Sequence, residues 1–89
     1  KIERIIEKHL NGEGKAHALR TRQSAAVKFI SMHIQVPGTW TVEKGHQHAT
    51  LIESDIIQTF PDAAVFTHLE PLNVPMAHEK SILSEYDEN

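Results

Sequence analysis

The 89-residue sequence has no cysteine, only four prolines and four glycines, and few aromatic residues (three Phe, one Trp and one Tyr). Without cysteine the chain has no disulfide framework and no thiolate ligand for a metal. Its longest stretch free of Asp, Glu, Lys and Arg, Phe29 to Val42, is too short and too polar to span a bilayer. Basic residues are not in excess, since the formal net charge is −3. That balance argues against nucleic acid or an anionic membrane surface as a partner.

Histidine is the residue type that is abundant, with seven copies. The hydrophobic fraction of 39% and the charged fraction of 24% are typical of an ordinary globular protein. We expect one small domain that buries only about 60–65% of the surface its unfolded chain exposes. A metal ion or a partner subunit would therefore help its stability. Because a helical pattern is already under way at Ile2, we also expect the sequence to be a piece of a longer chain.

Hydrophobic periodicity predicts the order helix, strand, strand, helix, strand. The predicted ranges are 2–10, 16–22, 26–36, about 42–60 and 63–69. Gln23-Ser24 is predicted to form a hairpin turn, and Pro37-Gly38 and Pro61-Asp62 bound the second helix. This order indicates an α+β sandwich, with two helices on one face of a three-stranded mixed sheet. We predict that residues 1–71 form the domain and that residues 72–89 are a loosely attached, flexible tail.

Five side chains can converge in such a fold. Residues two apart on a strand project to the same side, so His68 and Glu70 can meet one ion. His33 lies on the less apolar face of its strand, and His17 falls broadly opposite it across the predicted hairpin. His46 lies early in the apolar stripe of the second helix, where an imidazole needs a partner. The five residues therefore form a candidate metal site.

Imidazole nitrogens and a carboxylate suit zinc, although iron, cobalt, nickel and copper share the preference. Glu70 could complete one site or bridge two ions. Plainer interpretations also exist: His68 and Glu70 as solvated residues of an exposed strand face, and His46 as a core histidine bonded to a carbonyl. We interpret His48 as a surface residue, and His9 and His78, near the two ends, as solvated.

Four segments carry a resemblance to a known family. They are His17–Ser24, Phe29–Ile34, Gly45-His46 and Phe60–Pro71. Together they resemble the cytoplasmic C-terminal domain of cation diffusion facilitator transporters, most closely the bacterial zinc and iron efflux pumps of that family. The block Leu19–Ser24, LRTRQS, and the closing motif from His68 to Pro71 are specific to it.

The resemblance implies a metallochaperone-like (ferredoxin-like) domain that forms a V-shaped homodimer beneath a membrane domain, on the cytoplasmic side of the membrane. It places metal ligands at His17, His33, His46, His68 and Glu70, the last being aspartate in the closest relatives. The implied metal is Zn²⁺, with Fe²⁺, Cd²⁺, Co²⁺, Ni²⁺ or Mn²⁺ as other divalent ions. The implied role is regulatory: metal binding changes how the subunits sit and biases the attached membrane domain. Affinity should fall as pH drops through about 6.5, because imidazole must be neutral to bind.

Three alternatives remain open. The domain could be mainly a homodimerisation module with weak metal binding, or a stand-alone metal-binding protein. A hydrolase that uses metal-activated water is disfavoured, because no nucleophile motif or phosphate loop accompanies the histidines. We therefore expect no enzymatic activity.

Overall fold

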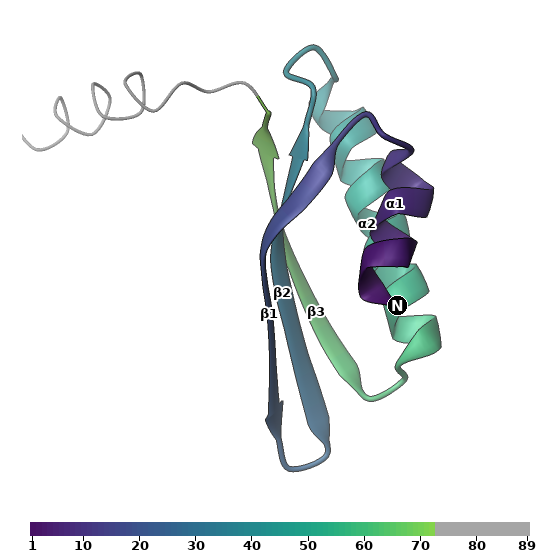
Figure 1. Ribbon diagram of the computed structural model, residues 1–89, viewed down its shortest axis with the longest axis vertical. Coiled ribbons are helices and arrows are strands. Elements are labelled where there is room, and N and C mark those ends of the chain that lie inside the picture. Colours follow the sequence, from purple (N-terminus) through teal and green to yellow (C-terminus); the bar gives the residue numbers. More distant parts are fainter. Residues whose placement is uncertain (73–89) are drawn as a thin grey trace, which may run out of the picture.

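The computed structural model of the protein describes residues 1–72, and both helices cover one face of a three-stranded sheet (Figure 1). The elements are α1 (Ile2–Leu10), β1 (Lys15–Ser24), β2 (Val27–Val36), α2 (Val42–Thr59) and β3 (Ala63–Pro71). The predicted order and the α+β class are confirmed. The predicted tail, residues 72–89, lies outside the described residues apart from Leu72.

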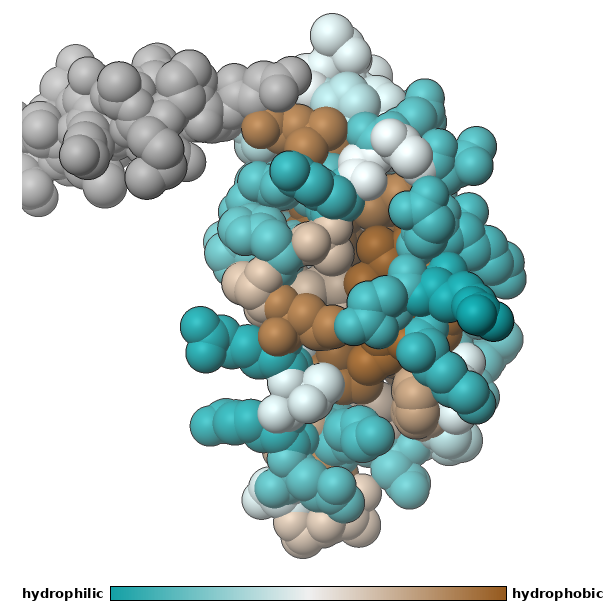
Figure 2. Space-filling view, viewed as in Figure 1, coloured by the Kyte–Doolittle hydropathy of each residue, from teal (hydrophilic) through white to brown (hydrophobic). Residues whose placement is uncertain are grey.

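The sheet has the order β1-β2-β3, with β1 antiparallel and β3 parallel to the central strand, as the prediction of a mixed sheet requires. Alternation along β2 decides which face is buried, because successive side chains point to opposite sides. Ile30, Met32, Ile34 and Val36 are buried beneath the helices, while the residues between them face the open side. Apolar side chains accordingly gather between the sheet and the helices (Figure 2).

Helix α2 begins at an N-cap, where the Thr41 side chain accepts a hydrogen bond from the Lys44 amide. Its buried stripe is Gly45, Ala49, Ile52 and Ile56. The prediction that Val42 and His46 belong to this stripe is wrong, since Val42 is 84% exposed and His46 is also exposed. Packing against the sheet starts only at Gly45, where a Cβ atom would lie 2.6 Å from Cδ2 of Leu69.

The β1–β2 hairpin turns at Ala25-Ala26, two residues later than predicted at Gln23-Ser24. Ser24 and Val27 are the last pair of the ladder, and Ala25 takes a positive φ of 54°. Gln23-Ser24 is the last polar pair before the two alanines, but both residues continue the strand instead. The turn therefore has no glycine or asparagine to mark it.

A β-bulge at Ala18 interrupts the pairing of β1 with β2. His17 pairs with His33 and Arg20 pairs with Ser31, so β1 has one residue more than β2 between these pairs. Ala18 has a φ of 55° and absorbs the extra residue. Strict alternation would put His17 and Leu19 on the same face. The bulge instead lets Leu19 pack against the core while His17 stays on the open face.

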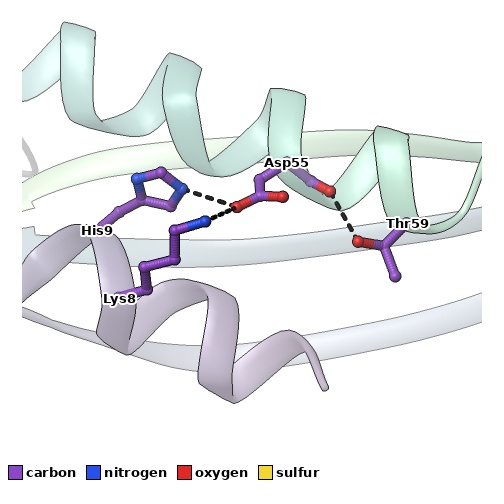
Figure 3. Close-up of polar contacts among 4 residues, drawn as sticks. All are labelled: Lys8, His9, Asp55 and Thr59. Carbon is purple, nitrogen blue, oxygen red and sulfur yellow. Dashed lines mark hydrogen bonds and ion pairs between the residues drawn. The ribbon is translucent and has the colours of Figure 1, made fainter.

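A polar cluster ties α1 to α2 on the helical side of the domain (Figure 3). Lys8 and His9 of α1 both point at Asp55 of α2, with Nζ of Lys8 3.2 Å and Nε2 of His9 3.0 Å from Oδ2. The His9 side chain is only 16% exposed, so the prediction of a solvated His9 is wrong. His9 lies next to the buried Leu10, and the turn of the helix carries it against α2. His78 lies outside the described residues.

The variant Asp55→Asn should destabilise the domain at neutral pH and lose this effect in acid. The hydrogen bond from His9, followed by that from Lys8, holds the pKa of Asp55 below its ordinary value of 3.8. A carboxyl with a lowered folded pKa stabilises the fold above its unfolded pKa and stops doing so as pH falls through the folded value. Urea unfolding midpoints of variant and parent should therefore differ at pH 7 and converge below about pH 3.8.

A suitable control is Asp62→Asn, because the side chain of Asp62 makes no ion pair within the described residues. The control should leave the midpoint almost unchanged at pH 7. A midpoint difference for Asp55→Asn that persists undiminished in acid would show that the lost contact is not the ionised one.

None of the helices within residues 1–72 is long and apolar enough to cross a lipid bilayer.

Candidate metal centre

The open face of the sheet carries four rows of residues that cross all three strands. Paired residues in neighbouring strands point to the same side, so each row can be read directly from the register. In order along the sheet they are Arg22, Phe29 and Ala64; Arg20, Ser31 and Phe66; His17, His33 and His68; and Lys15, Gln35 and Glu70. The third of these, the histidine row, brings one imidazole from every strand to the middle of the face.

Glu70 reaches from its own row into the histidine row. Nε2 of His17 donates to Oε1 of Glu70 at 2.7 Å, and Nδ1 of His33 donates to Oε2 at 2.8 Å. The amide of Gln35 donates to Oε1 at 3.2 Å. The hydrogen bond from His17, helped by that from His33, holds the pKa of the Glu70 carboxyl below its usual value of 4.5. Glu70 therefore presents an ionised carboxylate between two imidazoles.

His17, His33 and Glu70 offer three ligand atoms that all lie within 4.8 Å of one another. A tetrahedral zinc site with bonds of about 2.0–2.1 Å separates its ligand atoms by about 3.3 Å. The two hydrogen-bonded nitrogen–oxygen pairs, at 2.7 and 2.8 Å, need to move apart by about half an ångström to reach this spacing, and any pair wider than it needs to draw together. Among residues 1–72 no other group of His, Asp or Glu side chains reaches this density. The donor types and their spacing fit a divalent metal.

His68 and His46 complete the set predicted from the sequence, and the structure places them differently. The His68 ring is exposed and lies edge-on to His33, with centroids 5.2 Å apart, so it borders the three-residue group. The shared face of His68 and Glu70, and the position of His33 away from the apolar side, are as predicted. His46 is on the exposed side of α2 and is not within the group.

Sequence reasoning missed Gln35, although it lies two residues from His33 on the same strand face. Period-two spacing was the available signal. The sequence analysis also interpreted His48 as a surface residue. His48 is half-buried, its ring lies 4.5 Å from that of Trp40, and its Nδ1 donates to the carbonyl of Lys44. His48 therefore has a structural partner of its own, away from the open face of the sheet.

Comparison with known protein families gives a match over residues 1–72, to the family described as cation efflux protein, cytoplasmic domain (ZT_dimer). The chain belongs to this family. It is the cytoplasmic domain of a cation diffusion facilitator. Its relatives are parts of cation efflux transporters and not of enzymes.

Two relatives illustrate the similarity in sequence. The chain is 48% identical over 59 residues to the transporter sll1263 of Synechocystis, an alignment that covers 66% of this chain and 19% of the relative. It is 35% identical over 74 residues to the cation-efflux pump FieF of Escherichia coli, covering 82% of this chain and 25% of FieF. The chain thus spans a quarter or less of the length of these curated relatives.

Solved structures of cation diffusion facilitator domains share the fold. CzrB, described as a zinc transporter, has a TM-score of 0.74 and 27% identity, with 81% of this chain and 89% of that chain covered. The metal-bound C-terminal domain of the CzcD transporter from Thermotoga maritima has a TM-score of 0.67 and 28% identity, with 83% and 92% covered. Metal-bound and zinc forms are therefore known among domains of this fold.

Proposed function

We propose that this chain is the regulatory cytoplasmic domain of a divalent-cation efflux transporter, and that it binds zinc on the open face of its sheet. The observation that carries the proposal is Glu70, whose two carboxylate oxygens each accept a hydrogen bond from a different imidazole. A carboxylate held this way is ready to share a cation with both rings. When bound, the ion supplies a positive charge that holds these side chains together.

The proposed ligands are His17, His33, His46, His68 and Glu70. Four of them lie on the open face, in the histidine row and the row beside it. Gln35 positions Glu70, since its amide donates to the same oxygen as His17. His46 stays in the set on the family resemblance, because it is exposed and outside the three-residue group. An alanine variant at that position decides its membership. Residues 1–71 would form the metal-binding and dimerisation domain.

We further propose that the histidine half of the open face lies at the contact between two copies. An ion that takes ligands more favourably in one arrangement of the copies will shift the population toward it. The resulting change in subunit position would act on a membrane domain that is part of the same transporter, with this domain on the cytoplasmic side. The family name ZT_dimer supports the homodimer, and the metal-bound CzcD domain supports the ion.

Zinc titration followed by calorimetry and sedimentation velocity tests both parts of the proposal. We expect saturable heat and a shift toward a dimer in zinc, with reversal by a chelator, because ions shared at the contact favour the assembled state. The stoichiometry of the same titration distinguishes one ion from two. Mg²⁺ is the control, since its preference for octahedral oxygen coordination should leave both signals unchanged.

A dimer of identical shape in zinc and in chelator would favour the alternative of a dimerisation module that binds metal weakly. That alternative has an observation of its own, because Val27 and Phe66 are large apolar residues exposed on the same face. Absence of heat on zinc addition would contradict metal binding altogether.

A further inference from the structure

The half of the open face away from the histidines combines two arginines with two phenylalanines. Arg22 and Phe29 lie side by side in one row, and Arg20 and Phe66 lie in the next. They line a hollow of about 500 Å³, and Phe66 is 60% exposed. We call these four residues the arginine–phenylalanine patch. Exposed aromatic rings next to guanidinium groups are typical of a surface that binds a partner.

The two guanidinium groups have no acidic partner within the described residues. The nearest row with a carboxylate is that of Glu70, which is already bonded to His17 and His33. Lys8 of α1 differs, because it is paired with Asp55. What distinguishes the arginine–phenylalanine patch is that two such positive charges lie next to an exposed aromatic side chain on one face of the sheet. Its natural occupant is anionic and contains an aromatic or apolar side chain.

The open face of a second copy does not supply such an occupant within the described residues. Placing the two patches against each other would bring arginines onto arginines, and like charges in contact cost energy. Among residues 1–72, Glu70 is the one carboxylate in the rows of that face, and it is engaged. This consideration also agrees with the histidine half, rather than the patch, as the proposed contact between copies.

The chain itself carries a segment with the required chemistry. Residues 1–72 contain eight Lys or Arg and eight Asp or Glu, so they have no net formal charge, and the whole net charge of −3 resides in residues 73–89. Within that part, Glu85-Tyr86-Asp87-Glu88 places three carboxylates around one aromatic ring. Carboxylates form strong, often bidentate hydrogen bonds with arginine, and a tyrosine ring can pack on phenylalanine.

The connection is long enough for this segment to reach the patch. Leu72 is fixed at the far end of the sheet by its amide, which donates to the carbonyl of Val36 at 2.9 Å. Phe66 lies six residues back along β3, or about 20 Å at strand spacing. The residues between Leu72 and Glu85 can span about 40 Å when extended. A tether of this length also gives the segment a high effective concentration at the patch.

We propose that the acidic segment Glu85–Glu88 docks on the arginine–phenylalanine patch of its own chain. Its carboxylates pair with Arg20 and Arg22, and Tyr86 packs on Phe66. The segment then occupies the same open face that carries the proposed metal ligands, so, on the proposed function, it would limit how closely a second copy can approach beside the histidine row.

Backbone amide spectra of the full 89-residue chain, recorded in a chelator, test the docking. The variant Glu85→Gln/Asp87→Asn/Glu88→Gln should shift the amide signals of Arg20, Arg22 and Phe66 relative to the parent. The matched control Glu3→Gln/Glu7→Gln/Glu13→Gln removes the same number of charges from exposed positions and should leave these signals in place. About 1 M NaCl, where the Debye length is about 3 Å, should reproduce the shifts in the parent but not in the triple variant.

A second comparison isolates the pairing. In the background Arg20→Gln/Arg22→Gln, neutralising the acidic segment should no longer change the Phe66 signal, as expected of coupled residues. Unchanged patch signals in the first comparison would overturn the proposal. So would shifts at Lys1, Arg4 and Lys8 instead, or patch shifts that vanish on dilution, which would mean docking between chains. Because no metal is involved, failure here leaves the proposed metal binding untouched.

Discussion

The variant His33→Ala is expected to bind zinc at least about 100-fold more weakly than the parent chain. His33 lies at the centre of the histidine row, donates to Glu70, and has the rings of His17 and His68 at its two edges. Its removal takes away a proposed ligand and also one of the bonds that orient the carboxylate. Losing an outer-shell partner alone typically costs 10–100-fold in affinity, so losing a ligand should cost more than losing a partner.

Thermal unfolding makes this effect visible. At a free zinc concentration of 100 Kd, binding stabilises the folded state by about 2.7 kcal/mol, and at 1 Kd by about 0.4 kcal/mol. For a domain of this size the first figure is a rise of about 10–20 °C in Tm. Parent chain and variant, scanned at the same zinc concentration, should therefore differ by most of that rise while agreeing more closely in chelator.

His48→Ala is the matched control for this prediction. His48 is also a partly buried histidine with a bonded ring, but its partners are Lys44 and Trp40, away from the open face. It should keep the parent's zinc-dependent rise in Tm. Should His33→Ala keep that rise as well, the histidine row would not be the metal site.

The variant Ala18→Val is expected to destabilise the domain by about 1–3 kcal/mol and to weaken zinc binding together with it. Ala18 has a φ of 55°, a region that β-branched residues rarely enter. If valine forces the chain out of that region, the bulge is lost. His17 and Leu19 must then share a face, so that either the ligand or the core contact is given up.

Ala18→Gly separates the conformation from the side chain. Glycine adopts positive φ without the steric cost that L-residues meet there, so this variant should keep zinc affinity and match or exceed the parent's stability by up to about 1 kcal/mol. Urea midpoints measured with and without zinc report both effects. If the valine and glycine variants were equally stable, the bulge would not be what puts His17 and Leu19 on opposite faces.

Much of the open face follows from the period of two in the strands. Alternation sets the position of His33 on the less apolar face of β2 and the common side of His68 and Glu70, and the sequence predicts both. His17 was expected broadly opposite His33, and the two residues are paired. In these strands the polar and apolar residues alternate clearly enough to predict which side chains lie on the open face of the sheet.

The sequence failed where the backbone departs from regular geometry. Ala18 and Ala25 both take positive φ, yet alanine gives no signal for a bulge or a tight turn. The predicted apolar stripe of α2 began one turn too early, because hydrophobic periodicity does not say where a helix first meets the sheet. Val42 was misplaced for this reason. His46 instead follows the buried Gly45 by one residue, or about 100° around the helix, which turns its side chain to the exposed side. Its exposed position is where the family resemblance and the geometry of the single chain agree least.

Leu69 gives the face a mechanical connection to the other side of the molecule. It lies between His68 and Glu70 but points toward α2, where the absence of a side chain at Gly45 lets it come within contact distance of the helix backbone. Such a contact transmits displacement rather than absorbing it, because closely packed atoms have little room to yield. If a bound ion displaced β3 by a fraction of an ångström, the first turn of α2, on the opposite side of the sheet, would therefore be displaced with it.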